Sequence, residues 1–424
     1  MHLRLSRNFG LLLLAVALAL VVFLSKPTAH SVDFLVYYHA ARVLVDGHGV
    51  LYGPQSGIGW PQIFRYPPLF LLAFLPFALL PLKAALVLWV ALKCAALFFV
   101  AKALAVQTEF PRSGWWWLIP VCVCGGFIVQ EFRFGNAQFL IFVLVAAALW
   151  SLRQRPVLSA FLLAFAVSLK VWPLFFLPYV AARRHMRVAF LTGAFVIGLT
   201  LLPAVHFGWR GNIALLRQWT AQEWGTGSLG QQAWFPSQSL GGVLQRYLTA
   251  MDFSNWPDPN YPHVNFVAMD PRIVRVIWML LTVIGYGGLL LLARAAPARL
   301  DSLTDALSFC ALPLLQPFAY RPEMVVLLWP AMTAGALLAR REALPKWPRF
   351  LLWAAVLLEA LEPLTPGSQM QRFFQAAGVD CWVTCLLAAG LLAIWLQSRG
   401  AEDPARTSRR SFEVSAAPVA GPGG

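Results

Sequence analysis

Long apolar segments follow one another along almost the whole chain, and this pattern constrains the fold more than any other feature. Hydrophobic residues make up 59% of the sequence and charged residues only 12%, whereas soluble domains carry roughly 25% charged residues. The pattern therefore predicts an all-α polytopic membrane protein with about 12 transmembrane helices of about 20 residues each. The apolar segments are 9–25, 67–82, 84–106, 115–130, 136–150, 157–169, 171–182, 188–205, 273–295, 303–318, 323–340, 350–364 and 378–397.

The first apolar segment, 9–25, has the character of a signal peptide. No small-residue cleavage site is evident before Asp33, and further spans follow, so we expect this segment to be retained as the first helix. Two long polar stretches, 26–66 and 206–272, interrupt the apolar pattern. We expect both to form loops that carry interfacial helices, within one polytopic domain covering residues 1–397.

Lysines and arginines gather at the ends of the apolar segments, and this placement predicts the orientation. The formal net charge of +15 is explained by positively charged cytoplasmic loops better than by nucleic-acid binding. Both polar stretches then face outward in the cell membrane, and the tail 398–424 is expected to be cytoplasmic and disordered. The cytoplasmic groups are Arg4 with Arg7, the basic run 183–187, Arg294 with Arg299, Arg340 to Arg349, and the arginines of the tail.

The region 67–182 holds one apolar segment too many for a simple alternation, and two solutions stand. In the first, which we favour, 67–82 is re-entrant or does not span, and 157–169 and 171–182 are two short spans with Lys170 outside. In the second, 157–182 forms one long helix with Lys170 at mid-membrane, where a charge costs about 2.5–3.5 kcal/mol.

Several site types have no pattern in the sequence. All six cysteines lie in apolar stretches and none forms a CxxC pair, so we expect them to be buried small residues. The first outer loop has no DxD pair, and the chain has no Walker loop or GxGxxG pattern. We therefore expect no metal, no cofactor and no direct use of a nucleotide.

The stretch that opens the first outer loop begins with Asp33. Apolar side chains recur behind it at helical spacing, and Gly47 follows as a natural helix stop. This predicts an amphipathic helix on the membrane surface with its tyrosines at the headgroups. Asp33 itself could be an N-cap or a general base that takes a proton from a sugar hydroxyl. The apolar face consists of Phe34, Tyr37, Tyr38, Ala41, Leu44 and Val45.

The run DFLVYYHAARVLVDGHGVLY, followed by YPPLF, resembles the opening of the polyprenyl-phosphate-mannose-dependent mannosyltransferases, glycosyltransferase family 87, which have the GT-C membrane fold. Shorter echoes extend the resemblance over roughly residues 30–330. They are Gly135-Asn136-Ala137-Gln138, Lys170 before Trp172-Pro173, and Gln238-Ser239-Leu240. Where such proteins often carry a histidine pair, this chain reads Phe318-Ala319-Tyr320-Arg321-Pro322-Glu323.

This resemblance implies an inverting hexosyltransferase. Such an enzyme would move a hexose, most plausibly mannose, from a polyprenyl-phosphate carrier to a lipid or glycan acceptor on the outer face, among membrane lipids. Asp33 occupies the position of the aspartate that acts as base in the first outer loop. Two other classes remain open: a transporter or flippase for lipid-linked sugars, which usually shows inverted repeats, and an outer-face polymerase.

A lipid-phosphate leaving group requires cations near the outer interface. The candidates are Lys170, Arg321 and Arg65, each of which could instead snorkel to the headgroups. Tyr37, Tyr66, Asn136, Gln138 and Gln238 are the candidates for binding sugar or acceptor, although Asn136 could also cap a helix.

Four acidic residues outside the loops have alternative explanations. We expect Glu323 to pair with Arg321, and Glu131 to form a local pair with Arg133. Glu359 and Glu362 are expected to be exposed at the outer interface, although acids within a span are functional candidates by default.

Overall fold

The computed structural model describes residues 31–47, 49–53, 55–57, 59–111, 114–226, 237–254, 260–340, 344–362 and 368–400. Within these ranges the regular structure is entirely helical, which confirms the predicted all-α class. The predicted first span, 9–25, and the tail beyond residue 400 lie outside the described residues, so the structure does not test them. Residues 398–400 continue the last helix.

The helices follow the apolar segments closely. Their bounds are α2 Val32–Asp46, α3 Pro68–Ala78, α4 Leu82–Gln107, η1 Gly114–Trp117, α5 Leu118–Phe134, α6 Gln138–Ser151, α7 Pro156–Leu169, η2 Trp172–Phe175, α8 Phe176–Ala182, α9 Met186–Leu201, α10 Ala204–Thr226, α11 Leu240–Leu248, α12 Pro271–Ala295, η4 Ala298–Leu300, α13 Asp301–Leu315, η5 Arg321–Leu327, α14 Leu328–Ala339, α15 Lys346–Leu361, α16 Ser368–Ala376 and α17 Val379–Gly400.

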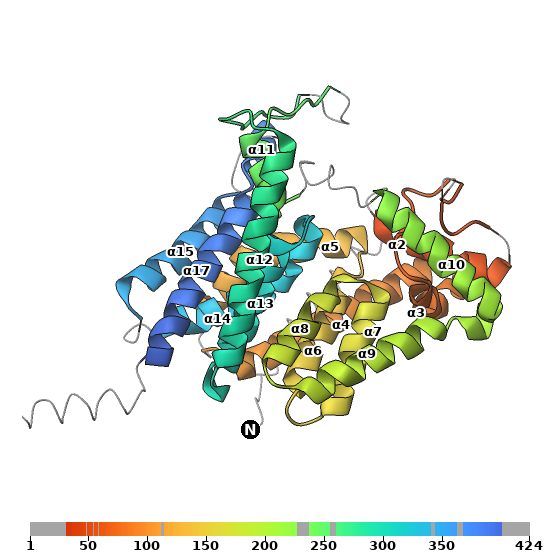
Figure 1. Ribbon diagram of the computed structural model, residues 1–424, viewed down its shortest axis with the longest axis horizontal. Helices are drawn as coiled ribbons and strands as arrows, with labels where there is room; N and C mark the ends of the chain where they lie inside the picture. Colours follow the sequence, from red (N-terminus) through yellow and green to blue (C-terminus); the bar gives the residue numbers. More distant parts are fainter. Residues whose placement is uncertain are drawn as a thin grey trace, which may run out of the picture.

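The helices form two packed groups that share α5, η5 and α14. In one group α7 packs against both α6 and α9, and α8 packs against α9, with α2 against α3 at their edge. In the other, α17 packs against both α13 and α15, and α12 lies against α13 (Figure 1). Because α5 contacts η5, α14 and α15 as well as α2, it connects the C-terminal helices to the first outer loop.

Among the described residues, five helical segments are long and apolar enough to cross a membrane, and the bent pair α9 and α10 would add a sixth. Four further apolar helices are shorter, including α6 and α7. The structure thus supports a multi-span membrane protein. A count of about 12 spans would require the short helices to cross as well.

Between α6 and α9 the chain crosses to the other end of the bundle in α7 and returns in α8. Asp301 pairs with Arg153 after α6 and with Arg183 after α8, each at 2.6 Å, so both arginines lie at the same end of the bundle. Between them, α7 ends at Lys170, whose backbone is extended. The alternative prediction of a single long helix over 157–182 is therefore wrong, and two short helices form instead. The helix α3, with 11 residues and a length of about 16 Å, is too short to span.

The two long polar stretches pack against each other. A bend of 94° separates α9 from α10, and α10 then lies along the first loop beside α2 and α3 (Figure 1). Gln222 of α10 accepts a hydrogen bond from the backbone of Gly53 and donates one to the carbonyl of Phe64. The contacting parts of the two stretches therefore lie on the same side of the protein. That this side is the outer one stays a prediction.

Candidate active site at the start of α2

The predicted apolar face of α2 is buried, but it packs against protein and not against the membrane surface. Phe34, Tyr37, Ala41 and Leu44 are buried, and α3 is the main packing partner. Tyr38 donates to the carbonyl of Leu80 at 2.8 Å. The expectation that the tyrosines lie among lipid headgroups is thus wrong, whereas Gly47, with φ of 72°, ends the helix as predicted.

Asp33 does not cap this helix. Ser31 is the N-cap residue, and Asp33 lies in the first turn with its carboxylate turned to other elements. Oδ2 accepts a hydrogen bond from Nδ2 of Asn136 at 2.9 Å, and Oδ1 accepts one from Nε2 of Gln62. The side chain is 8% exposed. The N-cap explanation therefore fails, and an acid is held by two amides at the loop side of the bundle.

The turn between α5 and α6 brings Asn136 to this carboxylate. Gly135 ends α5 in the left-handed conformation, with φ of 70°. A Cβ atom there would lie 2.5 Å from Cβ of Phe34, so only glycine allows the turn to approach α2 this closely. Trp89 also donates its indole N–H to the carbonyl of Gly135 at 2.9 Å.

The side-chain amide of Asn136 is fixed by three contacts. Its Oδ1 accepts from the backbone N–H of Gln138, the first residue of α6, at 2.9 Å. The N-cap residue of α6 is Ala137, so the expectation that Asn136 caps the helix is wrong. Because the oxygen is used there, the nitrogen must face the other way. It donates to Asp33 and, at 2.7 Å, to the hydroxyl of Tyr320.

A buried ion pair supports the same turn. Lys93 of α4 and Glu131 of α5 have fully buried side chains, with Nζ and Oε2 2.6 Å apart. Nζ also donates to the carbonyls of Glu131 and Asn136, at 3.1 and 2.9 Å. Glu131 Oε1 accepts from the backbone N–H of Phe139. The expected pair of Glu131 with Arg133 is therefore wrong, since Arg133 is exposed.

A hydrogen-bond chain leads from Asn136 to Lys170. Nζ of Lys170 donates to Oε1 of Gln138 at 2.9 Å and to Oε1 of Glu323 at 3.1 Å. It also lies 5.6 Å from the ring centre of Tyr66. Glu323 thus pairs with Lys170 and not with Arg321 as expected. Because an ammonium group has three donors and two are used here, Lys170 retains capacity to bind an anion.

Tyr37 and Tyr66 form one aromatic wall of the site. Their hydroxyls lie 2.6 Å apart, and both rings pack on Phe70. Burial raises the pKa of Tyr66 to about 12 and holds the pKa of Tyr37 well above its usual range, so both phenols are protonated at neutral pH. They can donate or accept hydrogen bonds but do not supply a negative charge.

Two candidates from the sequence lie in other surroundings. Arg65 is half exposed and pairs through two nitrogens with Glu223 of α10, at 3.1 and 3.2 Å. Gln238 is buried, and its Nε2 donates to the carbonyl of Gln375 at 3.0 Å. The first contact joins the two polar stretches, and the second joins the stretch 206–272 to α16. Neither contact includes Asp33.

Arg321 is held by three carboxylates. In the described residues its guanidinium contacts Glu362, Glu359 and Asp380, the last two at 3.3 Å, and none of these contacts reaches Asp33. Glu359 and Glu362 are buried, so the expectation that they are exposed is wrong. Oxygens of the three acids lie within 4.8 Å of one another, a spacing that could hold a metal ion, but Arg321 already supplies a positive charge there.

This arrangement predicts different roles for Arg321 and Lys170. Arg321→Lys keeps the charge but loses the planar fork, leaving carboxylate oxygens unpaired at a cost of about 1–3 kcal/mol. We expect a lower melting temperature, with the KM for the donor that the resemblance implies staying within about threefold of wild type. The comparison variant Lys170→Met should raise this KM and leave the melting temperature near that of the wild type. A large KM change in Arg321→Lys at unchanged stability would contradict this division.

Sequence reasoning missed several residues of this site. Gln62 and Tyr320 are ordinary polar residues of loops, and nothing in their spacing indicates a contact with Asp33 or Asn136. For Lys93 and Glu131 the sequence does contain a signal, since each is a charged residue within an apolar span and such a residue requires a partner. That signal does not identify the partner, since the two residues are far apart in the chain.

Comparison with known proteins shows the family of this chain. The model of glycosyltransferase family 87 matches residues 64–317, which is more than half of the chain. The chain belongs to glycosyltransferase family 87. The family match includes Arg65, Tyr66, Asn136, Gln138, Lys170 and Gln238, and it lies between Asp33 and Tyr37 on one side and Arg321 on the other.

Two curated relatives also match more than half of this chain. Each is a polyprenol-phosphate-mannose-dependent alpha-(1-2)-phosphatidylinositol mannoside mannosyltransferase. The Mycolicibacterium smegmatis protein is 28% identical over 263 residues, covering 57% of this chain and 58% of the relative. The Mycobacterium tuberculosis protein is 30% identical over 270 residues, covering 58% of this chain and 61% of the relative. The match thus spans about three fifths of each relative. No solved structure matches.

Proposed function

We propose that this family 87 protein is a membrane hexosyltransferase that moves mannose from a polyprenyl-phosphate carrier to a lipid or glycan acceptor. The observation that carries the proposal is the connected set of Asp33, Asn136, Gln138 and Lys170. It joins a candidate base to a candidate phosphate-binding cation. The names of the two relatives support the donor and the sugar.

In the proposed reaction, an acceptor hydroxyl attacks the anomeric carbon of the donor sugar while Asp33 takes the hydroxyl proton. The bond between that carbon and the phosphate oxygen breaks, and its electrons leave with the polyprenyl phosphate. Attack opposite the leaving group inverts the anomeric centre. Lys170 stabilises the charge that develops on the phosphate, and Asn136 holds Asp33 in position. Tyr37, Tyr66 and Gln138 are proposed to contact the sugar or acceptor.

We further propose a GT-C-like bundle of about 12 spans with this site on the outer face of the cell membrane. The positive-inside pattern supports that orientation, because the basic groups Arg153 and Arg183 lie at one end of the bundle and Asp33 at the other end of α6. This topology predicts that a thiol reagent that does not cross the membrane, added to whole cells, labels a cysteine introduced in the loop 49–66.

The direct test is sugar transfer by the purified protein. Incubation with defined polyprenyl-phosphate sugars and a membrane lipid extract, followed by mass spectrometry, should yield a mannosylated product, and its anomeric configuration reports inversion. Nucleotide-linked mannose serves as the control donor. Product from the nucleotide donor alone, or movement of the intact lipid-linked sugar across vesicles without product, would overturn the proposal.

The acid limb of the pH profile provides a second test. Burial raises the pKa of the Asp33 carboxyl, and the amide of Asn136 and the charge of Lys170 oppose this rise. Since the ionised form is the base, kcat/KM should fall as the pH drops through a pKa above the usual value of about 4. Asn136→Ala removes an opposing contribution and should move the limb to higher pH.

The control for this profile is Asn212→Ala. Asn212 is a buried amide that donates to the carbonyl of Thr200, away from Asp33, and its replacement should leave the limb in place. If the acid limb of the kcat/KM profile is unchanged in Asn136→Ala, or moves to lower pH, Asp33 is not the titrating base.

A further inference from the structure

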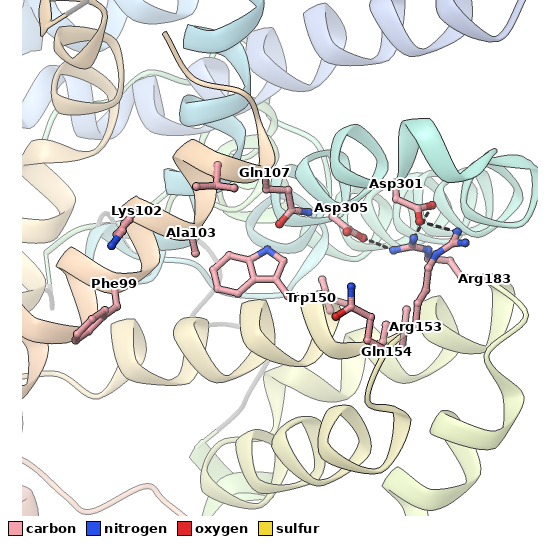
Figure 2. A pocket seen from close by; sticks show the side chains of 13 residues that line it. Phe99, Lys102, Ala103, Gln107, Trp150, Arg153, Gln154, Arg183, Asp301 and Asp305 are labelled. Carbon is pink, nitrogen blue, oxygen red and sulfur yellow. Dashed lines mark hydrogen bonds and ion pairs between the residues drawn. The ribbon is translucent and has the colours of Figure 1, made fainter. Parts of the chain in front are cut away.

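A cavity of about 610 Å³ lies at the end of the bundle opposite to Asp33. Its lining comes from the last turns of α4, the end of α6 with the residues after it, and the start of α13. Trp150 of α6 lines it (Figure 2), 12 positions beyond Gln138 and therefore about 18 Å further along the helix axis. The cavity is thus separate from the proposed transfer site.

The cavity presents several hydrogen-bond donors. The indole nitrogen of Trp150 is buried and has no partner within the described residues. Figure 2 shows it turned toward the space between Gln107 and Asp305. Gln154 and Lys102 also line the cavity. A buried donor without an acceptor costs about 1–3 kcal/mol, so a ligand with an acceptor oxygen is favoured here.

The charges that line the cavity favour an anion. Arg183 is neutralised by Asp301 and Asp305, each at 2.6 Å. Arg153 also contacts Asp301 but remains 54% exposed. Lys102 is exposed and forms no ion pair in the part of the chain that the structure describes. Three cations thus face two carboxylates, and the surplus positive charge lies at the open edge.

The rim of the cavity on α4 is apolar. Phe99 and Val106 line it and are 66% and 65% exposed, on a helix that is long and apolar enough to span a membrane. An acyl chain can therefore lie along α4 while a charged group reaches Lys102. Basic pockets between spans on the cytoplasmic side are known to bind lipid headgroups.

We propose that this cavity binds an anionic phospholipid of the cytoplasmic leaflet, with the phosphate beside Lys102 and another acceptor oxygen of the headgroup at the indole N–H of Trp150. Arg153 lies at the mouth, and the acyl chains run along Phe99 and Val106. The bound lipid joins α4, α6 and α13 at the end of the bundle that the arginines predict to be cytoplasmic. It therefore stabilises the folded protein by an amount that rises with the logarithm of the lipid concentration above the Kd.

The test uses the full chain purified in a neutral detergent. Phosphatidylglycerol and phosphatidylcholine are titrated separately, and binding is measured by native mass spectrometry and by the shift in melting temperature. We expect phosphatidylglycerol to bind and to raise the melting temperature more than phosphatidylcholine. Lys102→Gln should weaken phosphatidylglycerol binding about fivefold. Trp150→Phe, which removes the N–H together with part of the ring, should also weaken it.

The matched control is Lys83→Gln. Lys83 is exposed on the same helix but at its opposite end, so the variant removes the same charge away from the cavity and should bind like wild type. Because Lys102 is exposed, its replacement leaves the core intact. Equal loss in Lys83→Gln and Lys102→Gln, or equal binding of both lipids, would overturn the proposal.

Inorganic phosphate and glycerol 3-phosphate complete the experiment. If either raises the melting temperature as much as phosphatidylglycerol does, with the same dependence on Lys102, the ligand is a soluble phosphate and the lipid assignment falls. If neither does so, the acyl chains contribute to binding as the apolar rim predicts.

Discussion

Asp33→Asn is expected to abolish sugar transfer, with kcat/KM falling by about 10²–10⁴-fold, while the protein still folds and inserts. Asparagine keeps the size of the side chain but accepts no proton from the acceptor hydroxyl. Because burial raises the pKa of Asp33, its ionisation opposes folding at any pH above the usual carboxyl pKa of about 4. Removing the charge should therefore not lower the stability at neutral pH.

The measurement is the transfer assay with purified protein, alongside thermal unfolding. Asp46→Asn is a matched control, because Asp46 is an exposed acid at the other end of the same helix, paired with Arg42. It should transfer sugar at the wild-type rate. If Asp33→Asn retains most of the activity, the base must be another group and the proposed mechanism is wrong.

Lys93→Met is expected to have the largest effect on stability. It leaves Glu131 as a fully buried carboxylate without its partner, and breaking a buried ion pair in this way costs about 3–5 kcal/mol. It also removes the two hydrogen bonds from Nζ to the carbonyls of Glu131 and Asn136. The turn that presents Asn136 to Asp33 should then lose its position, and transfer should fall as well.

A double variant separates these two effects. Lys93→Met with Glu131→Gln removes both charges, and such replacements are often close to neutral for stability. The double variant should melt near the wild type yet transfer poorly, because the carbonyl of Asn136 still lacks its donor. Lys83→Met is the control on the same helix. Full activity in the double variant would show that Lys93 serves stability alone.

Local patterns in the sequence predicted much of the fold. The apolar segments correspond to the helices, because a bilayer selects for runs of about 20 apolar residues. Gly47 ends α2, since this effect depends only on neighbours in the chain. The resemblance in residues 33–68 pointed to the family that the comparison shows.

Partner choice among charged residues could not be predicted in the same way. Glu323 was expected with Arg321 and lies with Lys170, and Glu131 was expected with Arg133 and lies with Lys93. In each case the expected partner is close in sequence, and the observed one is on another helix. A buried charge binds whichever opposite charge the packing brings near, and sequence distance contains no information about that packing.

The sequence alone therefore determined the all-helical membrane class, the family and an acid at the head of the first outer loop, because these follow from composition and contiguous motifs. Only the tertiary structure decided which groups surround that acid. The glycine turn at Gly135 and the Lys93–Glu131 pair bring Asn136, and through it Lys170, to Asp33. Helices far apart in the chain supply these groups, and their distances depend on how the whole bundle packs.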